Sequence, residues 1–245
     1  MMGHCRFNRV LLKLSGESFC LPGEFGINGG SLESIAARIN EICKLGPQIG
    51  IVVGAGNFIR GETFSQKSHI PRNTADYMGM LATIINACTL QETLEKLGRE
   101  TRVMSAIEVS ALCEPFIRRR ALRHFEQGRV VILAGGTGNP FFTTDTCAAL
   151  RAAELDVDLL VKATKVDGVF SADPKKDPQA TLLPKLSYDD VLTRGLRIMD
   201  HAAISLCREN RIPIIVLNIF KQGNITRALA GEPVGTLIGD LRFML

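Results

Sequence analysis

The stretch 135–145 carries residue types suited to holding a phosphate group. It places three glycines within four residues, adds threonine hydroxyls, and follows an apolar run at 129–134. Glycine allows the backbone to approach a ligand closely and to adopt positive φ, and N–H groups ahead of a helix attract anions. We expect Thr144 to cap that helix. An ordinary strand–helix turn is the alternative, although Phe141 and Phe142 would then leave two large rings uncovered in a polar loop.

Two other strand ends offer similar groups. Lys13 lies in the apolar run 10–14, which leads into Gly16, and a glycine turn at 54–61 follows another apolar run. Ligands of open α/β sheets bind beyond the carboxyl ends of the strands, so these loops are expected to meet at one edge. A solvated lysine at a strand end is the alternative for Lys13. The turns are not a P-loop, because G-x-x-x-x-G-K-[ST] is incomplete, and the dinucleotide fingerprint fails at Ile59.

Two further stretches could bind a nucleotide. Asp76 is near the start of a predicted helix, where it could accept a bond from a ribose hydroxyl or simply favour the helix dipole. The stretch 162–174 combines lysines, a threonine, a phenylalanine and an aspartate, which together could hold a purine nucleotide. Within it, the Asp-Gly pair at 167–168 predicts a hairpin. The arginines at 118–123 are interpreted as a solvated helix face.

Alternating strand and helix patterns predict the framework that positions these residues. The predicted strands are 10–14, 49–54, 102–105, 129–134, 159–163, 213–218 and 236–238. The predicted helices are 31–45, 74–97, 115–127, 146–154, 187–194, 201–210 and 224–230, with Pro115 in a first turn. Uninterrupted apolar strands indicate burial on both faces. The expected fold is therefore α/β, a single-domain three-layer α/β/α sandwich with a mostly parallel central sheet. The glycine-rich stretch 21–30 is interpreted separately, as a flexible loop or hairpin that covers the protein or contacts another subunit.

Composition narrows the class of protein. The chain has 245 residues, a net charge of +4 and seven cysteines, enough for one large domain but too weakly basic to indicate nucleic-acid binding. The cysteines and the four histidines are dispersed, which predicts neither a disulfide framework nor a metal site. No run reaches the roughly 18 apolar residues of a membrane span. We expect a cytoplasmic protein that contacts neither membrane nor nucleic acid.

Taken together, the motifs resemble the bacterial UMP kinases (uridylate kinases) of the amino acid kinase superfamily. The similarity covers almost the whole chain, in the same order. The matching stretches are 13–16, 54–60, 78–83, 138–145 and 162–174. The octapeptide Gly-Asn-Pro-Phe-Phe-Thr-Thr-Asp at 138–145 is long enough to be specific.

The resemblance implies transfer of the γ-phosphoryl group of ATP to UMP, with Mg²⁺, in pyrimidine nucleotide biosynthesis. It implies a catalytic set of Lys13, Arg60 and Asp145. It implies an ATP site formed by Lys13, Leu14, Ser15, Gly16, Gly56, Arg60, Thr164, Phe170 and Asp173. It implies a UMP site formed by Ala55, Asp76, Thr137, Gly138, Asn139, Pro140, Phe141, Phe142, Thr143 and Thr144. The acceptor side would then lie mainly in 1–155 and the ATP side in 156–245, with no direct protein ligand for the metal and Asp145 at most in its outer shell.

The resemblance also implies a homohexamer inhibited by UTP and activated by GTP. Two departures bear on this: Ala55 stands where the family usually has glycine, and the loop 21–26 differs from the glycine-rich version associated with GTP activation. Activation by GTP is therefore left open. The alternatives are a related kinase acting on a carboxylate or carbamate, a nucleotide sensor without catalysis, and a dinucleotide oxidoreductase, which the broken fingerprint disfavours.

Overall fold

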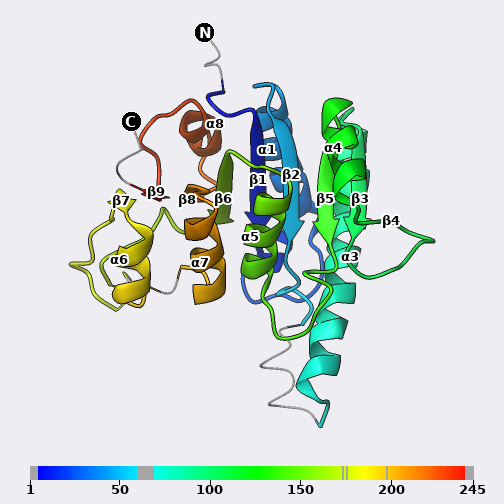
Figure 1. The fold of residues 1–245 in the computed structure, drawn as a ribbon, viewed down its shortest axis with the longest axis horizontal. Coiled ribbons are helices and arrows are strands. Elements are labelled where there is room, and N and C mark those ends of the chain that lie inside the picture. Colours follow the sequence, from blue (N-terminus) through cyan, green and yellow to red (C-terminus); the bar gives the residue numbers. More distant parts are fainter. Residues whose placement is uncertain (1–4, 60–68, 173, 175, 197, 241–245) are drawn as a thin grey trace.

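The framework is a single, mostly parallel sheet, seen in a computed structural model that describes residues 5–59, 69–172, 174, 176–196 and 198–240. Its strands are β1 (Arg9–Leu14), β2 (Gln48–Val53), β3 (Thr101–Ser105), β4 (Glu114–Pro115), β5 (Val130–Ala134), β6 (Leu159–Thr164), β7 (Lys185–Leu186), β8 (Ile214–Asn218) and β9 (Thr236–Ile238). They are ordered β4-β3-β5-β2-β1-β6-β8-β9-β7 (Figure 1). Among the described strands, β8 and β9 form the one antiparallel pair. The predicted fold class is confirmed.

Strand β1 is central and fixes the register of the site. It pairs in parallel with β2 on one side and with β6 on the other. Leu11, Leu12 and Leu14 are fully buried, and burying each such side chain contributes about 1.5–3 kcal/mol. Lys13 is directly opposite Lys162 of β6. Because side chains alternate across a strand, these two lysines point to the same face of the sheet.

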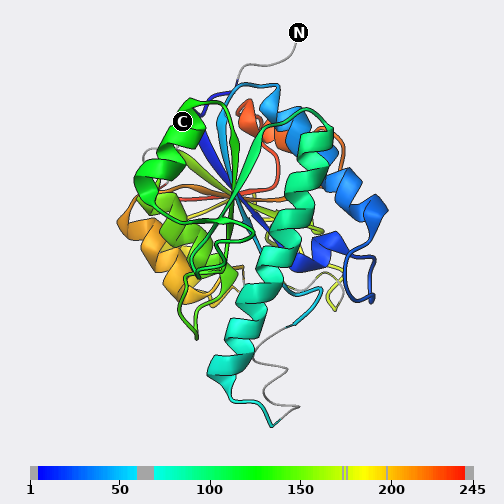
Figure 2. The same cartoon turned by 90° about the vertical axis from the view of Figure 1, so that its right-hand side faces the viewer.

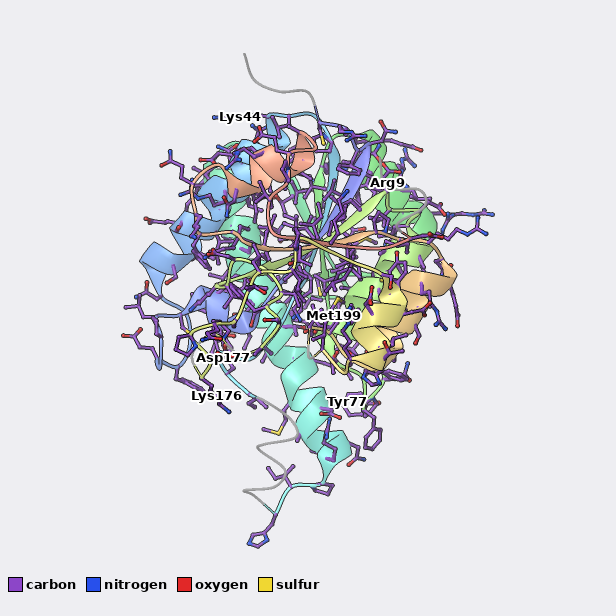
Figure 3. The ribbon with its side chains drawn as sticks, turned by 90° about the vertical axis from the view of Figure 1, so that its left-hand side faces the viewer. Arg9, Lys44, Tyr77, Lys176, Asp177 and Met199 are labelled. Atoms are coloured by element: carbon purple, nitrogen blue, oxygen red, sulfur yellow. The ribbon has the colours of Figure 1, made fainter. Side chains whose placement is uncertain are left out.

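Helices cover both faces of the sheet (Figure 2). The first face packs against α1 (Gly29–Cys43), α3 (Arg72–Lys96) and α8 (Asn224–Leu229). The second packs against α4 (Arg118–Glu126), α5 (Thr144–Glu154), α6 (Tyr188–Thr193) and α7 (His201–Glu209). Each face has its own apolar core, because even-numbered residues of β1 enter the first and Leu11 enters the second. Helix α3 extends well beyond the sheet, and Figure 3 shows Tyr77 on this extension, away from Arg9 and Lys44.

Several local predictions were wrong. Pro115 lies in β4, and α4 begins three residues later at Arg118. Thr143, not Thr144, caps α5, through bonds from the N–H groups of Asp145 and Thr146. Helix α1 begins at Gly29 because the Asn28 side chain caps it, so part of the predicted glycine-rich loop is helical.

The predicted hairpin at 167–168 was also wrong. The antiparallel contact nearby is a bridge between Phe170 and Leu182, so a longer connection closes it. Gly168 instead packs tightly, since a Cβ there would be 2.7 Å from the Thr236 hydroxyl. The short elements β4, β7 and η1 (Gly16–Phe19, a 3₁₀ helix) were not predicted. Among the described helices, none is both long and apolar enough to cross a bilayer.

Candidate active site

A cavity of about 290 Å³ opens at the carboxyl edge of β1, β2 and β5. Three loops and one face of α3 form its walls. It is lined by Lys13, Ser15, Gly16, Gly54, Ala55, Gly56, Ile59, Arg72, Asp76, Gly79, Met80, Thr83, Gly136, Thr137, Phe142, Thr143 and Thr144. The size and the mixture of hydroxyls, backbone amides and charged groups suit a polar small molecule.

The loops after β1 and β2 touch backbone to backbone. A Cβ on Gly16 would be 2.3 Å from the Gly56 nitrogen and 2.7 Å from the Ala55 carbonyl carbon. Any side chain at Gly16 would therefore push the two loops apart. The Gly54 N–H also donates to the Leu14 carbonyl at 2.8 Å, so the two turns are built as one unit.

An ionic cluster on the second face of the sheet links three elements. The Asp145 carboxylate, in the first turn of α5, lies between the lysines of β1 and β6. The distance from Nζ of Lys13 to Oδ1 is 2.8 Å, and the distance from Nζ of Lys162 to Oδ2 is 2.7 Å. Lys162 also donates to the Ile198 carbonyl. One carboxylate thus holds two ammonium groups side by side at the strand ends.

Burial and charge shift the pKa values of this cluster. Burial opposes ionisation of Asp145, but the two neighbouring ammonium groups outweigh it and lower the pKa of the carboxyl. Burial lowers the pKa of Lys162, and Lys13 adds to this, although Asp145 acts in the opposite direction. The carboxylate is therefore firmly ionised at neutral pH.

The cluster should make stability depend on pH in the acid range. A carboxyl whose pKa is lowered by folding stabilises the protein above its unfolded pKa of about 3.9, and this contribution is lost as the pH falls through the folded pKa. We expect the Tm of the wild-type protein to fall more steeply below about pH 4 than that of Asp145→Asn. Thermal unfolding from acid to neutral pH checks this, with the exposed Glu33→Gln as control. Parallel curves for wild type and Asp145→Asn would contradict it.

Asp200, the cap of α7, ties this helix to α5. Its Oδ2 accepts from the hydroxyls of Thr143 and Thr146, the latter at 2.9 Å, and its Oδ1 accepts from the Ala203 N–H at 2.9 Å. A second cavity of about 400 Å³ lies here, lined by Asp145, Lys162, Gly195, Leu196, Ile198, Met199, Asp200 and His201. The ionic cluster therefore borders both cavities, with Lys13 in the first and Asp145 in the second.

On the other side of the first cavity, Asp76 joins α3 to the loop after β5. Its carboxylate accepts from Nε of Arg72 at 2.9 and 3.0 Å and from the N–H of Phe141 at 2.8 Å. Phe141 has φ of 71°, an uncommon conformation that this bond helps to hold. The Arg72 guanidinium lies 6.0 Å from the centroid of the Phe141 ring. Thr83, also on α3, accepts from the Gly135 N–H at 2.8 Å.

Comparison with known proteins assigns the family. The amino acid kinase family profile matches residues 8–218. The chain belongs to the amino acid kinase family. It is similar to the UMP kinase of Bacillus anthracis, with 41% identity and a TM-score of 0.93 over 96% of this chain and 97% of that one.

Two other solved structures point the same way. The UMP kinase of Ureaplasma parvum is 34% identical, with a TM-score of 0.89 over 96% of this chain and 100% of that one. The uridylate kinase of Archaeoglobus fulgidus is 28% identical, with a TM-score of 0.72 over 94% of this chain and 100% of that one. The family resemblance inferred from the sequence motifs is confirmed.

Many of the residues singled out from the sequence of this member of the amino acid kinase family do meet in space. The first cavity is lined by the predicted residues Lys13, Ser15, Gly16, Ala55, Gly56, Asp76, Thr137, Phe142, Thr143 and Thr144. Asp145 joins them through Lys13. Gly138, Asn139, Pro140 and Phe141 belong to the same loop but do not line this cavity.

Other predicted residues lie elsewhere. The Leu14 side chain is fully buried in the sheet, so only its backbone could meet a nucleotide. Thr164 ends β6 and donates to the carbonyls of Val166 and Leu217, outside both cavities. Phe170 takes part in the bridge with Leu182. Arg60 and Asp173 lie outside the described residues.

Several polar cavity residues were assigned no role from the sequence, among them Arg72, Thr83, Asp200 and Lys162, the last of which appeared only as a member of the stretch 162–174. The sequence held a signal for one of them. Lys162, like Lys13, is a charged residue near the carboxyl end of an apolar strand, and the two are register partners. Asp200 had no comparable signal, because it approaches Thr143 only through the packing of α7 on α5.

Proposed function

We propose that this chain is a UMP kinase, which transfers the γ-phosphoryl group of ATP to UMP and gives UDP and ADP. The observation that carries the proposal is the Lys13–Asp145–Lys162 cluster, which borders two cavities at one edge of the sheet. Two adjacent ammonium groups between two ligand-sized spaces suit the meeting point of two phosphate chains. Similarity to UMP kinases along nearly the full chain supports the choice of acceptor.

The first cavity is proposed as the acceptor site. Thr137, Thr143 and Thr144 offer hydroxyls, and the loop 135–143 leads into the N-terminus of α5, which favours a phosphate. Phe142 lines the same space and offers a ring for a base to pack on. Asp76 would accept a bond from a ribose hydroxyl, because two carboxylate oxygens have about four acceptor sites, and Arg72 and Phe141 use three of them.

The donor side is proposed to run from the β1 loop toward the second cavity. Ser15, Gly16 and Gly56 would contact ATP phosphates, together with Arg60 and the backbone of Leu14. Thr164, Phe170 and Asp173 would hold the adenosine. In this arrangement residues 1–155 form mainly the acceptor side and residues 156–245 mainly the ATP side, of one domain.

Phosphoryl transfer depends on positioning and charge neutralisation more than on acid–base chemistry. The acceptor is a phosphate oxygen with a second pKa of about 6, so it is already ionised at neutral pH and needs no general base. The obstacle is repulsion between two anions. Lys13 and Lys162 would supply the opposing charge, and Asp145 would hold both ammonium groups in place before the substrates arrive.

Mg²⁺ is proposed to arrive with ATP. Among the described residues, no group of three His, Cys, Asp or Glu side chains could hold a metal ion alone, and both oxygens of Asp145 already pair with lysines. This donor set fits an ion carried mainly by phosphate oxygens and water. When bound, the ion would neutralise charge on the transferred phosphate.

The test is release of ADP from ATP and Mg²⁺ in the presence of UMP, dUMP, CMP, AMP, aspartate or carbamate. We expect rapid turnover with UMP and slow turnover with the others. Rapid turnover with aspartate or carbamate would replace UMP by a carboxylate or carbamate acceptor. No turnover with any acceptor, together with binding of UTP, would indicate a nucleotide sensor.

Replacement of Asp76 tests the acceptor site. Loss of a hydrogen bond to a charged group costs about 1.5–3 kcal/mol, so Asp76→Ala should raise the KM for UMP by roughly 10- to 100-fold and the KM for ATP far less. The preference for UMP over dUMP should also narrow. Asp156→Ala, which removes an exposed carboxylate outside both cavities, is the control. A change confined to the KM for ATP would mean that the two sites are reversed.

Self-association and regulation complete the proposal. Tyr77, Leu81 and Ile85 are exposed along one stripe of α3, by 43%, 50% and 51%, which supports self-association that covers them. A homohexamer is proposed from the family resemblance. Inhibition by UTP and a role in pyrimidine nucleotide biosynthesis are proposed from the family resemblance, whereas activation by GTP stays open because the loop 21–26 departs from the family version. Seven free cysteines support a cytoplasmic location, because thiols stay reduced there. Light scattering measures the oligomer directly.

A further inference from the structure

Two buried asparagines, Asn57 and Asn86, form a reciprocal amide pair next to the first cavity. Asn57 lies in the turn 54–58 after β2, and Asn86 lies on α3. The Nδ2 of Asn57 donates to Oδ1 of Asn86 at 2.9 Å, and the Nδ2 of Asn86 donates to Oδ1 of Asn57 at 2.8 Å. Asn57 is 3% exposed and Asn86 is 0% exposed. Neither residue lines the cavity, so neither is placed to touch a substrate.

The remaining side-chain N–H groups of the two asparagines bind the turn 54–58 and the loop 21–26. Asn86 also donates to the Gly54 carbonyl at 2.8 Å, and Asn57 also donates to the Gly26 carbonyl at 2.8 Å. The Gly26 N–H returns a bond to the Asn57 carbonyl at 2.9 Å. The pair therefore fastens the turn 54–58 to α3 on one side and to the end of the 21–26 loop on the other.

The place of this turn determines the shape of the proposed transfer site. The volume that a Cβ on Gly16 would occupy is filled by the Gly56 nitrogen at 2.3 Å and by Oδ1 of Asn57 at 2.6 Å. The turn is thus pressed directly against the loop that follows Lys13. A small shift of the turn would change the separation between Gly56 and Gly16, the two backbones proposed to meet the ATP phosphates.

Helix α3 aligns this turn with the acceptor loop. Asp76, Thr83 and Asn86 all bond to site loops: Asp76 to Phe141, Thr83 to Gly135, and Asn86 to Gly54. Their spacing of seven and then three residues brings them to one face of the helix. The same helix face therefore sets the position of the β5 loop and of the β2 turn relative to each other.

We infer that Asn57 and Asn86 are a positioning unit for phosphoryl transfer, which fixes the turn 54–58 against Gly16 without touching either substrate. The inference rests on the proposed function. The physical reason is that each buried amide satisfies the other, so removal of one leaves the Oδ1 and one N–H of its partner, and one glycine carbonyl, without a bond. A turn released in this way would lose the alignment on which the rate depends, while most substrate contacts would survive.

The experiment compares Asn57→Ala, Asn86→Ala and the double variant with wild type. Each single variant should lower kcat by about 10²-fold, the scale of a misplacement near 1 Å, and should change the KM for UMP and for ATP far less. The double variant should be no slower than the slower single variant, because residues that act as a unit are not additive. Leu90→Ala removes a fully buried side chain from the same helix and is the control for lost stability; its kcat should stay near wild type.

Hydrogen exchange provides a readout that does not depend on catalysis. The N–H groups of Phe58 and Ile59 both donate to the Ala55 carbonyl at 2.9 Å. Both should exchange faster in the Asn variants, whereas the Leu160 N–H, bonded to the Pro213 carbonyl in the sheet, should not. If Asn86→Ala does not fold, Asn86→Ser, which keeps a hydroxyl donor, is measured with the same expected direction.

The outcomes separate the two proposals. Unchanged exchange at Phe58 and Ile59, a kcat loss matched by Leu90→Ala, or multiplicative losses in the double variant would each overturn the positioning unit. If wild type phosphorylates no acceptor, the proposed UMP kinase activity fails. Exchange at Phe58 and Ile59 then still decides whether the pair holds the turn.

Discussion

Asp145→Asn is expected to lower kcat by about 10³-fold, the upper end of the loss for one preorganised group, with much smaller changes in both KM values. The substitution keeps the shape of the side chain but removes the charge that holds Lys13 and Lys162 together. Two ammonium groups would then face each other with Asp200 as the remaining carboxylate acting on Lys162, and they would separate or lose a proton. Steady-state kinetics with UMP and ATP measures the effect.

The same variant should change the pH dependence of the rate. Asp145 raises the pKa of Lys162, against the effects of burial and of Lys13. Without the carboxylate this pKa falls, so the protonated, active form is lost at lower pH. The alkaline limb of the kcat profile should therefore move toward neutral pH. Glu154→Gln, on the same helix, is the control: it removes a carboxylate that pairs with Arg151 and should change neither kcat nor its pH profile. A kcat for Asp145→Asn within a few-fold of wild type would exclude Asp145 from the mechanism.

Residue type and local pattern were enough to predict much of this site. The loop 135–145 was predicted from its glycines and hydroxyl side chains. Lys13 was predicted because it is a charged residue near the end of an apolar strand. These signals are local, because a loop that binds phosphate needs the same amides and turns in any fold. Asp76 was predicted from its helix, and its bond to Phe141 is the contact that joins the helix to the loop.

What escaped prediction depends on tertiary packing. The pairing of Lys162 with Asp145 requires the parallel register of β1 with β6, which no single segment encodes. In the sequence, Asn86 resembles any other polar residue of a helix until the turn 54–58 is placed against it. The Asp200 bonds to α5 likewise depend on how two helices pack.

The local errors have local causes. Thr143 and Thr144 are both good capping residues, and the choice between them depends on where the backbone of the loop enters α5. Pro115 suits a first helical turn, but it lies instead in the edge strand β4, which pairs with β3 and places Pro115 opposite Ser105. The Asp-Gly pair at 167–168 suits a hairpin, yet the Phe170–Leu182 bridge closes over a longer connection instead.

Lys13→Ala is expected to lower kcat by about 10²-fold or more, the scale of one lost preorganised charge partner. Lys13 is 8% exposed, lines the acceptor cavity and reaches Asp145, so its charge is held where the two phosphate chains are proposed to meet. Its removal leaves Asp145 paired with Lys162 alone. The Lys13 ammonium group also repels Lys162 and lowers its pKa, and this repulsion disappears in the variant. Lys162 therefore stays charged and still pairs with Asp145, so the variant should not leave an unpaired buried charge that weakens the fold.

The control and the conservative variant make this result specific to the site. Lys44→Ala removes an exposed lysine at the end of α1 that lines neither cavity of the ionic cluster, so kcat should be unchanged. Lys13→Arg keeps the charge but spreads it over a planar group that cannot occupy the same point, and it should recover only part of the rate. A positioned point charge predicts the order wild type, then Lys13→Arg, then Lys13→Ala. Equal rates for wild type and Lys13→Ala would remove Lys13 from catalysis, and equal rates for Lys13→Arg and wild type would mean that net charge alone matters at this edge of the sheet.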